Sequence, residues 1–260
     1  MTKVVVISGA SAGIGKTAAE MFLKKGYTVY NLSRRKTEEI RHIKTDITKP
    51  EEVKAALKTV FESEGRIDVL VNNAGMGISG AVESTELDAI RRMFEVNFYG
   101  AISLIQEALP YMRKNGGGTI INISSAAARM SIPFQAFYSS SKSALCSLSD
   151  ALRLETAPFN IKVTSVLPGD VKTEFTEKRE KNKGIDPVYG ARIERAGGVM
   201  ERDEINGMSP QVIGKIIVKL AEMKNPPPQV IGGSKYVFLL NLAKLVPRRF
   251  VSYIIGKLYS

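Results

Sequence analysis

The sequence predicts an α/β fold, in which a doubly wound parallel sheet of about seven strands carries helices on both faces. Three observations predict it. Short runs rich in valine and isoleucine alternate with longer segments at helical spacing along the chain. The first run ends in a glycine-rich turn, and the sequence shows no internal repeat. At 260 residues the chain also has the size of a single domain.

The composition excludes several classes of function. A single cysteine, Cys146, rules out an intrachain disulfide and fits a reducing compartment. Because the single histidine, His42, stands far from any nucleophile-elbow pattern, neither a zinc site nor a Ser-His-Asp hydrolase is expected, and we predict no metal site. The net charge of +11 suits nucleic acid, an anionic membrane or an anionic cofactor. The basic residues are not interleaved with aromatic ones, so we expect no nucleic-acid partner.

Neither a targeting segment nor a membrane span is predicted. The residues before the first strand are too few and wrongly flanked for a signal peptide. No apolar run reaches the ~18 residues that a membrane span needs. We therefore expect a cytoplasmic protein, and membrane association remains open for its C-terminal tail.

The first strand, residues 4–8, leads into a turn suited to a pyrophosphate. Gly9, Gly13 and Gly15 stand at Gly-x-x-x-Gly-x-Gly spacing, and residues 16–24 follow at helical spacing. The N–H groups and the dipole at a helix N-terminus attract anions, and glycine lets a phosphate come close. After the first strand of a parallel sheet, such a turn indicates a dinucleotide.

The end of the second strand indicates which dinucleotide. Residues 28–32 form this strand, and Ser33, Arg34 and Arg35 follow it. A free ribose 2'-hydroxyl is usually met here by a carboxylate, whereas a 2'-phosphate calls for a cation. Because no acidic residue stands at this point, the sequence favours NADP(H) over NAD(H), although ordinary surface arginines would look the same.

The next strands deliver polar residues to their C-terminal ends. The third, fourth and fifth strands are expected over residues 43–47, 67–71 and 119–123. Asp46, Asn73 and Ser125 stand at or just after their ends, where ligands bind in a doubly wound sheet. Thr48 is expected to cap the helix after the third strand. A helix over about 87–109 carries Asn97 among apolar neighbours, where a buried amide needs a partner or a role.

Tyr138 and Lys142 lie four residues apart in a helix expected to end before Pro158. Residues at this spacing are neighbours on one helix face. A neighbouring cation favours the phenolate, so it lowers the tyrosine pKa from its ordinary ~10 toward neutrality. Such a pair could move a proton to or from an alcohol oxygen. On its own, Tyr-x-x-x-Lys is more often an ordinary helix surface.

The chain changes character after a sixth strand over residues 161–167. Residues 174–208 are charged, contain glycine and lack periodicity, which is typical of a lid over a substrate site. A helix over 210–223 and a strand over 229–231 complete a domain of residues 1–235. The tail, residues 236–260, is apolar and basic. We expect it to pack over the substrate pocket or on a partner subunit, with a membrane surface as the alternative.

Taken in order, these motifs resemble the short-chain dehydrogenase/reductase family over about residues 3–235, near its hydroxysteroid and retinol dehydrogenase branch. The matching residues are Ser8 to Gly15, Asp46, Asn72 to Gly75, Asn97, Ser125, Tyr138, Lys142, Pro168, Gly169, Val171 and Thr173. The resemblance implies a Rossmann fold that binds NAD or NADP and interconverts an alcohol and a carbonyl compound.

The resemblance also implies a role for each residue. Tyr138 would be the catalytic acid/base, Ser125 would steady the substrate oxygen, and Asn97 would position a relay water. Lys142 would lower the tyrosine pKa and hold the nicotinamide ribose. The implied cofactor-binding residues are Gly9, Ser11, Gly13, Ile14, Gly15, Ser33, Arg34, Arg35, Asp46, Ile47, Asn73, Ala74, Gly75, Tyr138, Lys142, Pro168, Gly169, Val171 and Thr173.

Three contacts to the cofactor are specific expectations. Asp46 would meet the adenine, Asn73 the adenosine-side ribose, and Val171 with Thr173 the carboxamide. Ala12 departs from the family pattern, because many NADP-binding relatives carry a basic residue there. Recognition of a 2'-phosphate would then depend on Ser33 and the two arginines that follow it.

The substrate is predicted to be a bulky hydrophobic alcohol or ketone, with a hydroxysteroid as the leading example. A lipid or acyl ketone and a retinoid are alternatives. Ser125, Met76, Phe134 and Phe175 are the candidate substrate residues, although core packing would explain the apolar ones equally well. Two other classes stay open: a non-catalytic NADP-sensing protein and a lipid-surface protein driven by the tail. Because family members usually form dimers or tetramers, we expect a homodimer or homotetramer.

Overall fold

A seven-stranded, all-parallel sheet forms the centre of the computed structural model, which describes residues 2–181, 186 and 188–259. Its strands follow the order β3-β2-β1-β4-β6-β7-β9, so the order reverses between β1 and β4. Their bounds are β1 Val4–Ser8, β2 Thr28–Ser33, β3 Arg41–Lys44, β4 Val69–Asn72, β6 Gly118–Ile123, β7 Ile161–Pro168 and β9 Gln229–Gly232. The predicted doubly wound α/β fold is confirmed.

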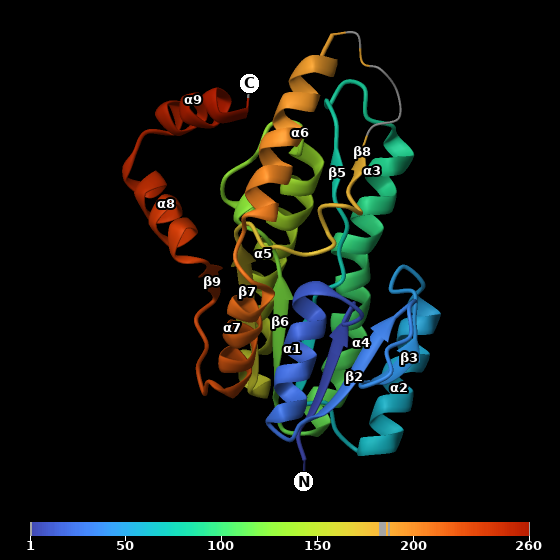
Figure 1. Ribbon diagram of the computed structural model, residues 1–260. Coiled ribbons are helices and arrows are strands. Elements are labelled where there is room, and N and C mark those ends of the chain that lie inside the picture. The colour runs from blue at the N-terminus through green and yellow to red at the C-terminus, as the bar shows by residue number, and fades with distance from the viewer. Residues whose placement is uncertain (1, 182–185, 187, 260) are drawn as a thin grey trace.

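Helices cover both faces of this sheet (Figure 1). Side chains of α1 and α7 join one hydrophobic cluster against the sheet, and side chains of α2, α4 and α5 join the other. The helices are α1 Gly13–Lys24, α2 Pro50–Glu64, α3 Leu87–Phe94, α4 Gly100–Lys114, α5 Ala136–Thr156, α6 Gly190–Ile205, α7 Pro210–Glu222, α8 Ser234–Leu245 and α9 Arg248–Tyr259.

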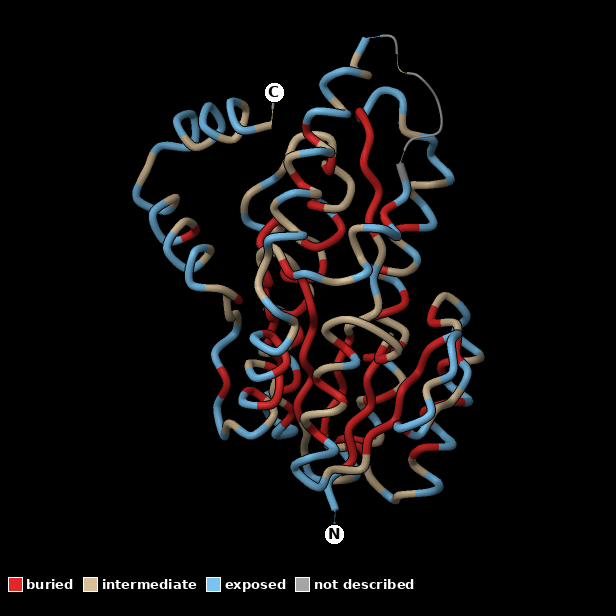
Figure 2. Tube along the Cα trace, viewed as in Figure 1, coloured by how far each residue is buried: buried red, intermediate tan, exposed pale blue. Residues whose placement is uncertain are grey.

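The five inner strands are buried on both faces, as the tube in Figure 2 shows in red, whereas the edge strands β3 and β9 are mostly exposed or partly buried. All five residues of β1 are buried. Val5 and Ile7 point to the cluster under α1 and α7, whereas Val4 and Val6 point to the opposite cluster. Successive side chains of a strand point to opposite faces, so a continuous β-branched run fills both layers of core.

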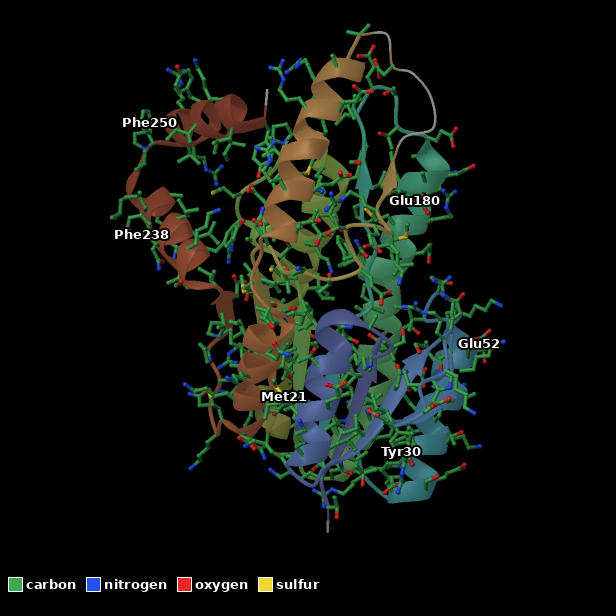
Figure 3. All side chains as sticks on the ribbon, in the orientation of Figure 1. Met21, Tyr30, Glu52, Glu180, Phe238 and Phe250 are labelled. Carbon is green, nitrogen blue, oxygen red and sulfur yellow. The ribbon has the colours of Figure 1, made fainter. Side chains whose placement is uncertain are left out.

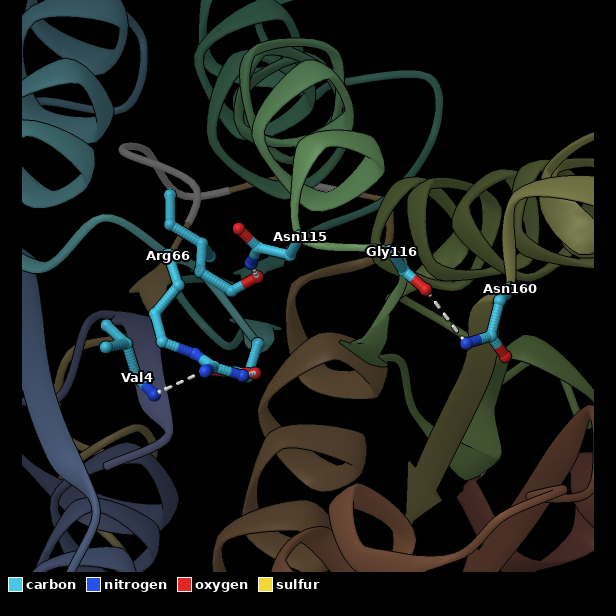
Figure 4. Close-up of polar contacts among 7 residues, drawn as sticks. Val4, Arg66, Asn115, Gly116 and Asn160 are labelled. Atoms are coloured by element: carbon cyan, nitrogen blue, oxygen red, sulfur yellow. Dashed lines mark hydrogen bonds and ion pairs between the residues drawn. The ribbon is translucent and has the colours of Figure 1, made fainter. Parts of the chain in front are cut away.

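Polar contacts hold the N-terminal ends of the strands together (Figure 4). The backbone N–H of Val4 donates to Asp68 Oδ2 over 2.7 Å, and the Arg66 guanidinium donates to both oxygens of that carboxylate. The Asn160 amide donates to the Gly116 carbonyl oxygen over 3.0 Å. The opposite, C-terminal ends of the strands are therefore the ones left to form a site.

Two local predictions need correction. Thr48 does not cap α2: Lys49 occupies the N-cap position, and the Thr48 hydroxyl donates to Asp46 instead. The long helix expected over residues 87–109 is interrupted, because a π-helical turn over Glu95–Tyr99 joins α3 to α4.

The segment predicted as a lid contains regular structure. It includes a short strand, β8 (Glu180–Lys181), which pairs with β5 (Ile78–Ser79), and the helix α6. Residues 182–185 and 187 of the predicted lid lie outside the described residues. The tail forms α8 and α9; α8 runs along the outside of the domain, and α9 returns to pack on α6 (Figure 1). In the part of the chain that the structure describes, no helix is both long and apolar enough to span a bilayer.

Candidate active site

A cavity of about 1490 Å³ lies at the C-terminal ends of the strands. Most of the residues predicted for the site line it. They are Gly9, Ser11, Gly13, Ile14, Ser33, Arg34, Arg35, Asp46, Ile47, Asn73, Ala74, Gly75, Met76, Ser125, Tyr138, Lys142, Pro168, Gly169, Val171, Thr173 and Phe175. The exceptions are Gly15, Asn97 and Phe134, which lie outside the lining.

Tyr138 faces the cavity from the first turns of α5, and its phenol hydrogen-bonds with the hydroxyl of Ser125, which follows β6. Burial raises the pKa of the Tyr138 phenol to about 12, although the hydrogen bond to Ser125 acts in the opposite direction. The expected lowering of this pKa by Lys142 is therefore not observed, because burial outweighs every nearby charge. At neutral pH the phenol keeps its proton and can donate it.

Lys142 lies one helical turn further along α5, buried at the floor of the cavity. Its ammonium is 5.9 Å from the centroid of the Tyr138 ring, and it donates a hydrogen bond to the Ile123 carbonyl oxygen over 2.9 Å. Burial lowers the pKa of Lys142 to about 8. The group is thus still cationic at neutral pH, but it loses its charge at a lower pH than an exposed lysine.

Asn97 belongs to the π-helical turn, and such turns are frequent at functional sites. Its side chain holds the backbone of Met76 in both directions: Oδ1 accepts from the Met76 N–H over 2.8 Å, and Nδ2 donates to the Met76 carbonyl over 2.9 Å. A Cβ at Gly75 would lie 3.3 Å from both Asn97 Oδ1 and Lys142 Nζ. Asn97 therefore fixes the cavity wall beside Lys142.

The glycine turn has the geometry that a dinucleotide pyrophosphate needs. Gly9 and Gly13 have φ angles of +72° and +55°. A Cβ at Gly15 would lie 2.4 Å from Asn73 Nδ2, which donates to two carbonyl oxygens of the turn over 3.0 and 3.1 Å. No side chain caps the N-terminus of α1, so its first N–H groups remain available to an anion. The Asn73 side-chain amide thus braces the turn, and its contact with the ribose stays a prediction.

The end of β2 carries the predicted cations. Arg34 and Arg35 both line the cavity, and the Ser33 hydroxyl donates to the Arg35 carbonyl over 2.7 Å. The Arg35 guanidinium lies 3.7 Å from Glu174, with both side chains more than half exposed, so this ion pair is weak. The two guanidinium groups can therefore turn toward a bound anion.

Asp46 lines the same end of the cavity. Its carboxylate accepts from both the N–H and the hydroxyl of Thr48, over 3.1 and 2.8 Å. Although burial acts in the opposite direction, these hydrogen bonds keep the pKa of Asp46 below its ordinary value. Asp46 therefore stays an anionic acceptor.

Of the aromatic residues predicted for the substrate, only one lines the cavity. The ring of Phe175 lies 5.8 Å from that of Tyr138, measured between centroids, and Met76 lies in the same wall. Phe134 has a φ of +62°, and its ring packs against Tyr189 instead, 6.4 Å away. Phe134 therefore lies outside the cavity lining, because this left-handed turn directs the ring toward the start of α6.

Several cavity residues were missed from the sequence. Arg179, Asp203 and Glu204 come from the predicted lid, and Asp170 follows the Pro168-Gly169 pair. Helices α8 and α9 supply another group, made up of Lys235, Tyr236, Leu239, Ile255, Leu258 and Tyr259. Their sequence spacing carries no signal, because only the fold brings these segments together.

A family model described as short chain dehydrogenase matches residues 3–184, which include the glycine turn, Ser125, Tyr138 and Lys142. The chain belongs to the short-chain dehydrogenase/reductase family. It is therefore an oxidoreductase of alcohol and carbonyl groups whose fold binds a nicotinamide cofactor.

Individual short-chain dehydrogenases resemble this chain over nearly their whole length. The 3-ketodihydrosphingosine reductase of Bacteroides thetaiotaomicron is 38% identical over 99% of this chain and 98% of its own. A short-chain dehydrogenase structure from Streptomyces avermitilis has a TM-score of 0.83 and 29% identity, and covers 97% of this chain and 96% of its own. A structure of ElxO with NADP bound has a TM-score of 0.77 and 28% identity, and covers 92% of this chain and 100% of its own.

Proposed function

We propose that this short-chain dehydrogenase/reductase reduces the ketone of a long-chain lipid, with NADPH as its cofactor. The observation that carries the proposal is the position of Tyr138 and Ser125 in the wall of a cavity that extends to apolar side chains of the tail. A phenol that keeps its proton suits the donation of a proton to a carbonyl oxygen, which is the step that reduction requires.

The similarity to 3-ketodihydrosphingosine reductase favours a lipid ketone over the hydroxysteroid that led the sequence-based expectations. The cavity supports the same choice. Leu239, Ile255 and Leu258 of the tail line it together with Met76 and Phe175. Apolar side chains on separate elements suit a flexible alkyl chain, because burial of each CH₂ group contributes ~0.8 kcal/mol.

The reaction needs few groups of the protein. A bound NADPH would supply the hydride that the carbonyl carbon receives. The Ser125 hydroxyl donates to the carbonyl oxygen and orients it. Tyr138 transfers its proton to that oxygen, so the C=O π bond is replaced by a C–H and an O–H bond. The resulting phenolate is stabilised by the Lys142 ammonium until solvent returns the proton.

The residues around the cavity fit a dinucleotide, and they favour the phosphorylated one. The glycine turn has backbone donors for a pyrophosphate, and Asp46 is an acceptor for an adenine amino group. Arg34 and Arg35 supply positive charge where a carboxylate would be expected for NAD. Solved relatives include complexes with NADP and with NADH, so the choice depends on the two arginines.

A ketone panel tests the proposal. Purified protein is mixed with NADPH and either 3-ketodihydrosphingosine, a steroid ketone, retinal or a 3-ketoacyl thioester, and NADPH absorbance is followed. We expect the highest kcat/KM for the long-chain ketone. Tyr138→Phe should lower kcat by ~10²–10⁴-fold and leave NADPH binding intact.

Tyr111→Phe is the matched control, because that tyrosine stacks on Phe61 outside the cavity lining and should not affect turnover. Undiminished turnover in the Tyr138 variant would eliminate the mechanism. A clear preference for the steroid ketone would restore the hydroxysteroid alternative.

A further inference from the structure

A charged cluster beside Tyr138 takes no part in the proton transfer described above. Glu204, on α6, forms an ion pair with Arg179, and the Thr176 hydroxyl donates to the second oxygen of the same carboxylate over 2.5 Å. Both Arg179 and Glu204 line the cavity. Their charges act on the pKa of Tyr138: Glu204 raises it and Arg179 lowers it, although burial and the hydrogen bond to Ser125 have larger effects.

Arg179 has an unused donor. Its side chain is only 3% exposed, and its Nε has no hydrogen-bond partner among the described residues. Leaving such a buried donor unpaired is unfavourable, because it has lost its hydrogen bonds to water. The guanidinium lies 6.0 Å from the centroid of Phe175, whose ring lies beside Tyr138. An acceptor on a substrate held at Tyr138 could therefore satisfy this N–H.

Glu204 has the complementary capacity. A carboxylate can accept about four hydrogen bonds, and Arg179 and Thr176 use one each. The remaining positions suit a donor, and a cationic donor best, because the side chain is only 16% exposed and its charge is poorly screened by water. The cluster thus offers an acceptor and a donor side by side, in the same cavity that Tyr138 lines and on the other side of Phe175.

We propose that Glu204 and Arg179 form a head-group subsite for a long-chain ketone with an amino group on the carbon next to the carbonyl and a hydroxyl one carbon further. Glu204 binds the ammonium, and the Arg179 Nε–H donates to the hydroxyl oxygen. This assignment rests on the proposed function, and it narrows the substrate from any lipid ketone to an amino-alcohol ketone. Thr176 is a positioning residue, because it acts only through Glu204.

The first test compares two ketones of equal chain length, one with the amino group and one without it, both with the hydroxyl and both below their critical micelle concentrations. NADPH consumption gives kcat/KM for each. For the wild type we expect kcat/KM to be at least tenfold higher for the amino ketone than for the other ketone. In Glu204→Gln, kcat/KM for the amino ketone alone should fall ~10–100-fold, so the preference is lost. Glu194→Gln removes the same charge from an exposed position of α6 and should leave the preference unchanged.

A second variant tests the donor. Arg179→Lys keeps the positive charge beside Glu204 but has no Nε–H. The variant should reduce amino ketones with and without the hydroxyl at similar kcat/KM. The wild type should favour the one that carries the hydroxyl. Melting temperatures of both variants show whether the fold is intact.

A binding measurement separates the subsite from the chemistry. With NADPH present, the alcohol product that carries the amino group should raise the melting temperature of the wild type more than the alcohol that lacks the amino group. In Glu204→Gln the two alcohols should raise it equally. Equal shifts in the wild type, or an equal loss of turnover on both ketones in Glu204→Gln, would overturn the subsite. Failure of the wild type to reduce either ketone would overturn the proposed function, while the binding comparison would still decide the subsite.

Discussion

At the level of single residues, burial acts on Tyr138 and Lys142 in opposite senses. It raises the pKa of the phenol to about 12 and lowers the pKa of the ammonium to about 8, because in both cases the neutral form is favoured. Below pH 8 the phenol is protonated and the lysine charged, which is the combination that reduction needs. Above pH 8 the lysine loses its charge first.

The rate of ketone reduction should therefore depend on pH in a defined way. We expect kcat/KM for the ketone to stay level up to about pH 8 and to fall above it, as Lys142 loses the charge that stabilises the phenolate. Oxidation of the alcohol should instead rise with pH, because Tyr138 must then accept a proton. Initial rates of reduction and oxidation over pH 6–10 test this. If kcat/KM of Lys142→Met still falls above the same pH, the fall belongs to the titration of another group.

The arginines after β2 should determine the cofactor preference. Replacing Arg34 and Arg35 by alanine removes the charges that a 2'-phosphate would meet, so the affinity for NADPH should fall ~10–100-fold while that for NADH changes little. Fluorescence titration of each cofactor measures this. Lys36→Ala is the matched control, because Lys36 is the next cation in the chain but does not line the cavity. Equal losses for NADPH and NADH would argue against a phosphate contact.

At the level of elements, α6 is held by its contacts with neighbours rather than by its own propensity. Its interior contains Gly197 and Gly198, and a Cβ at either would meet no atom within 4 Å. Glycine in a helix interior costs ~1 kcal/mol relative to alanine. Each Gly→Ala substitution should then raise the melting temperature by ~2–4 °C, measured by calorimetry. A lower melting temperature would mean that α6 needs these glycines for its curvature or its contacts.

The same substitution should have the opposite effect in the glycine turn. In Gly15→Ala the new Cβ would lie 2.4 Å from Asn73 Nδ2 and 2.7 Å from the Gly9 carbonyl oxygen. The turn must shift to relieve this overlap, at a cost of ~1–3 kcal/mol in stability. We expect the variant to lose both NADPH binding and the hydrogen bonds that the Asn73 amide donates to the turn. A variant that still binds NADPH with wild-type affinity would contradict the role given to this turn.

How far the sequence predicts these elements depends on what stabilises them. The strands of the sheet follow from continuous β-branched runs, and the glycine turn and the Tyr138–Lys142 spacing are local patterns. α6 was missed because only Ala196 and Met200 among its residues are buried, too few to produce a periodic pattern. The ion pair of Arg179 and Glu204 joins residues 25 apart, so no local pattern could reveal it.

At the level of the whole molecule, the tail extends the cavity to an exposed apolar and basic surface. Its residues, 236–260, include four Lys or Arg and no acidic residue. Phe238 and Phe250, labelled in Figure 3, lie on the outer side of α8 and α9 and are 67% and 54% exposed. Leu258 lines the cavity and is also exposed. The tail therefore connects the substrate cavity to a surface whose chemistry complements an anionic bilayer.

This surface should bind vesicles that contain anionic lipid. Basic residues near such a bilayer contribute ~1 kcal/mol each, and exposed aromatic side chains insert at the head-group level. We expect the protein to float with phosphatidylserine-containing vesicles, and to remain unbound with pure phosphatidylcholine. Arg248→Glu combined with Arg249→Glu should abolish flotation, while Lys24→Glu combined with Lys54→Glu, the same charge change on α1 and α2, should not. If both double variants behave alike, net charge rather than the tail controls binding, and the lipid substrate must reach the cavity by another route.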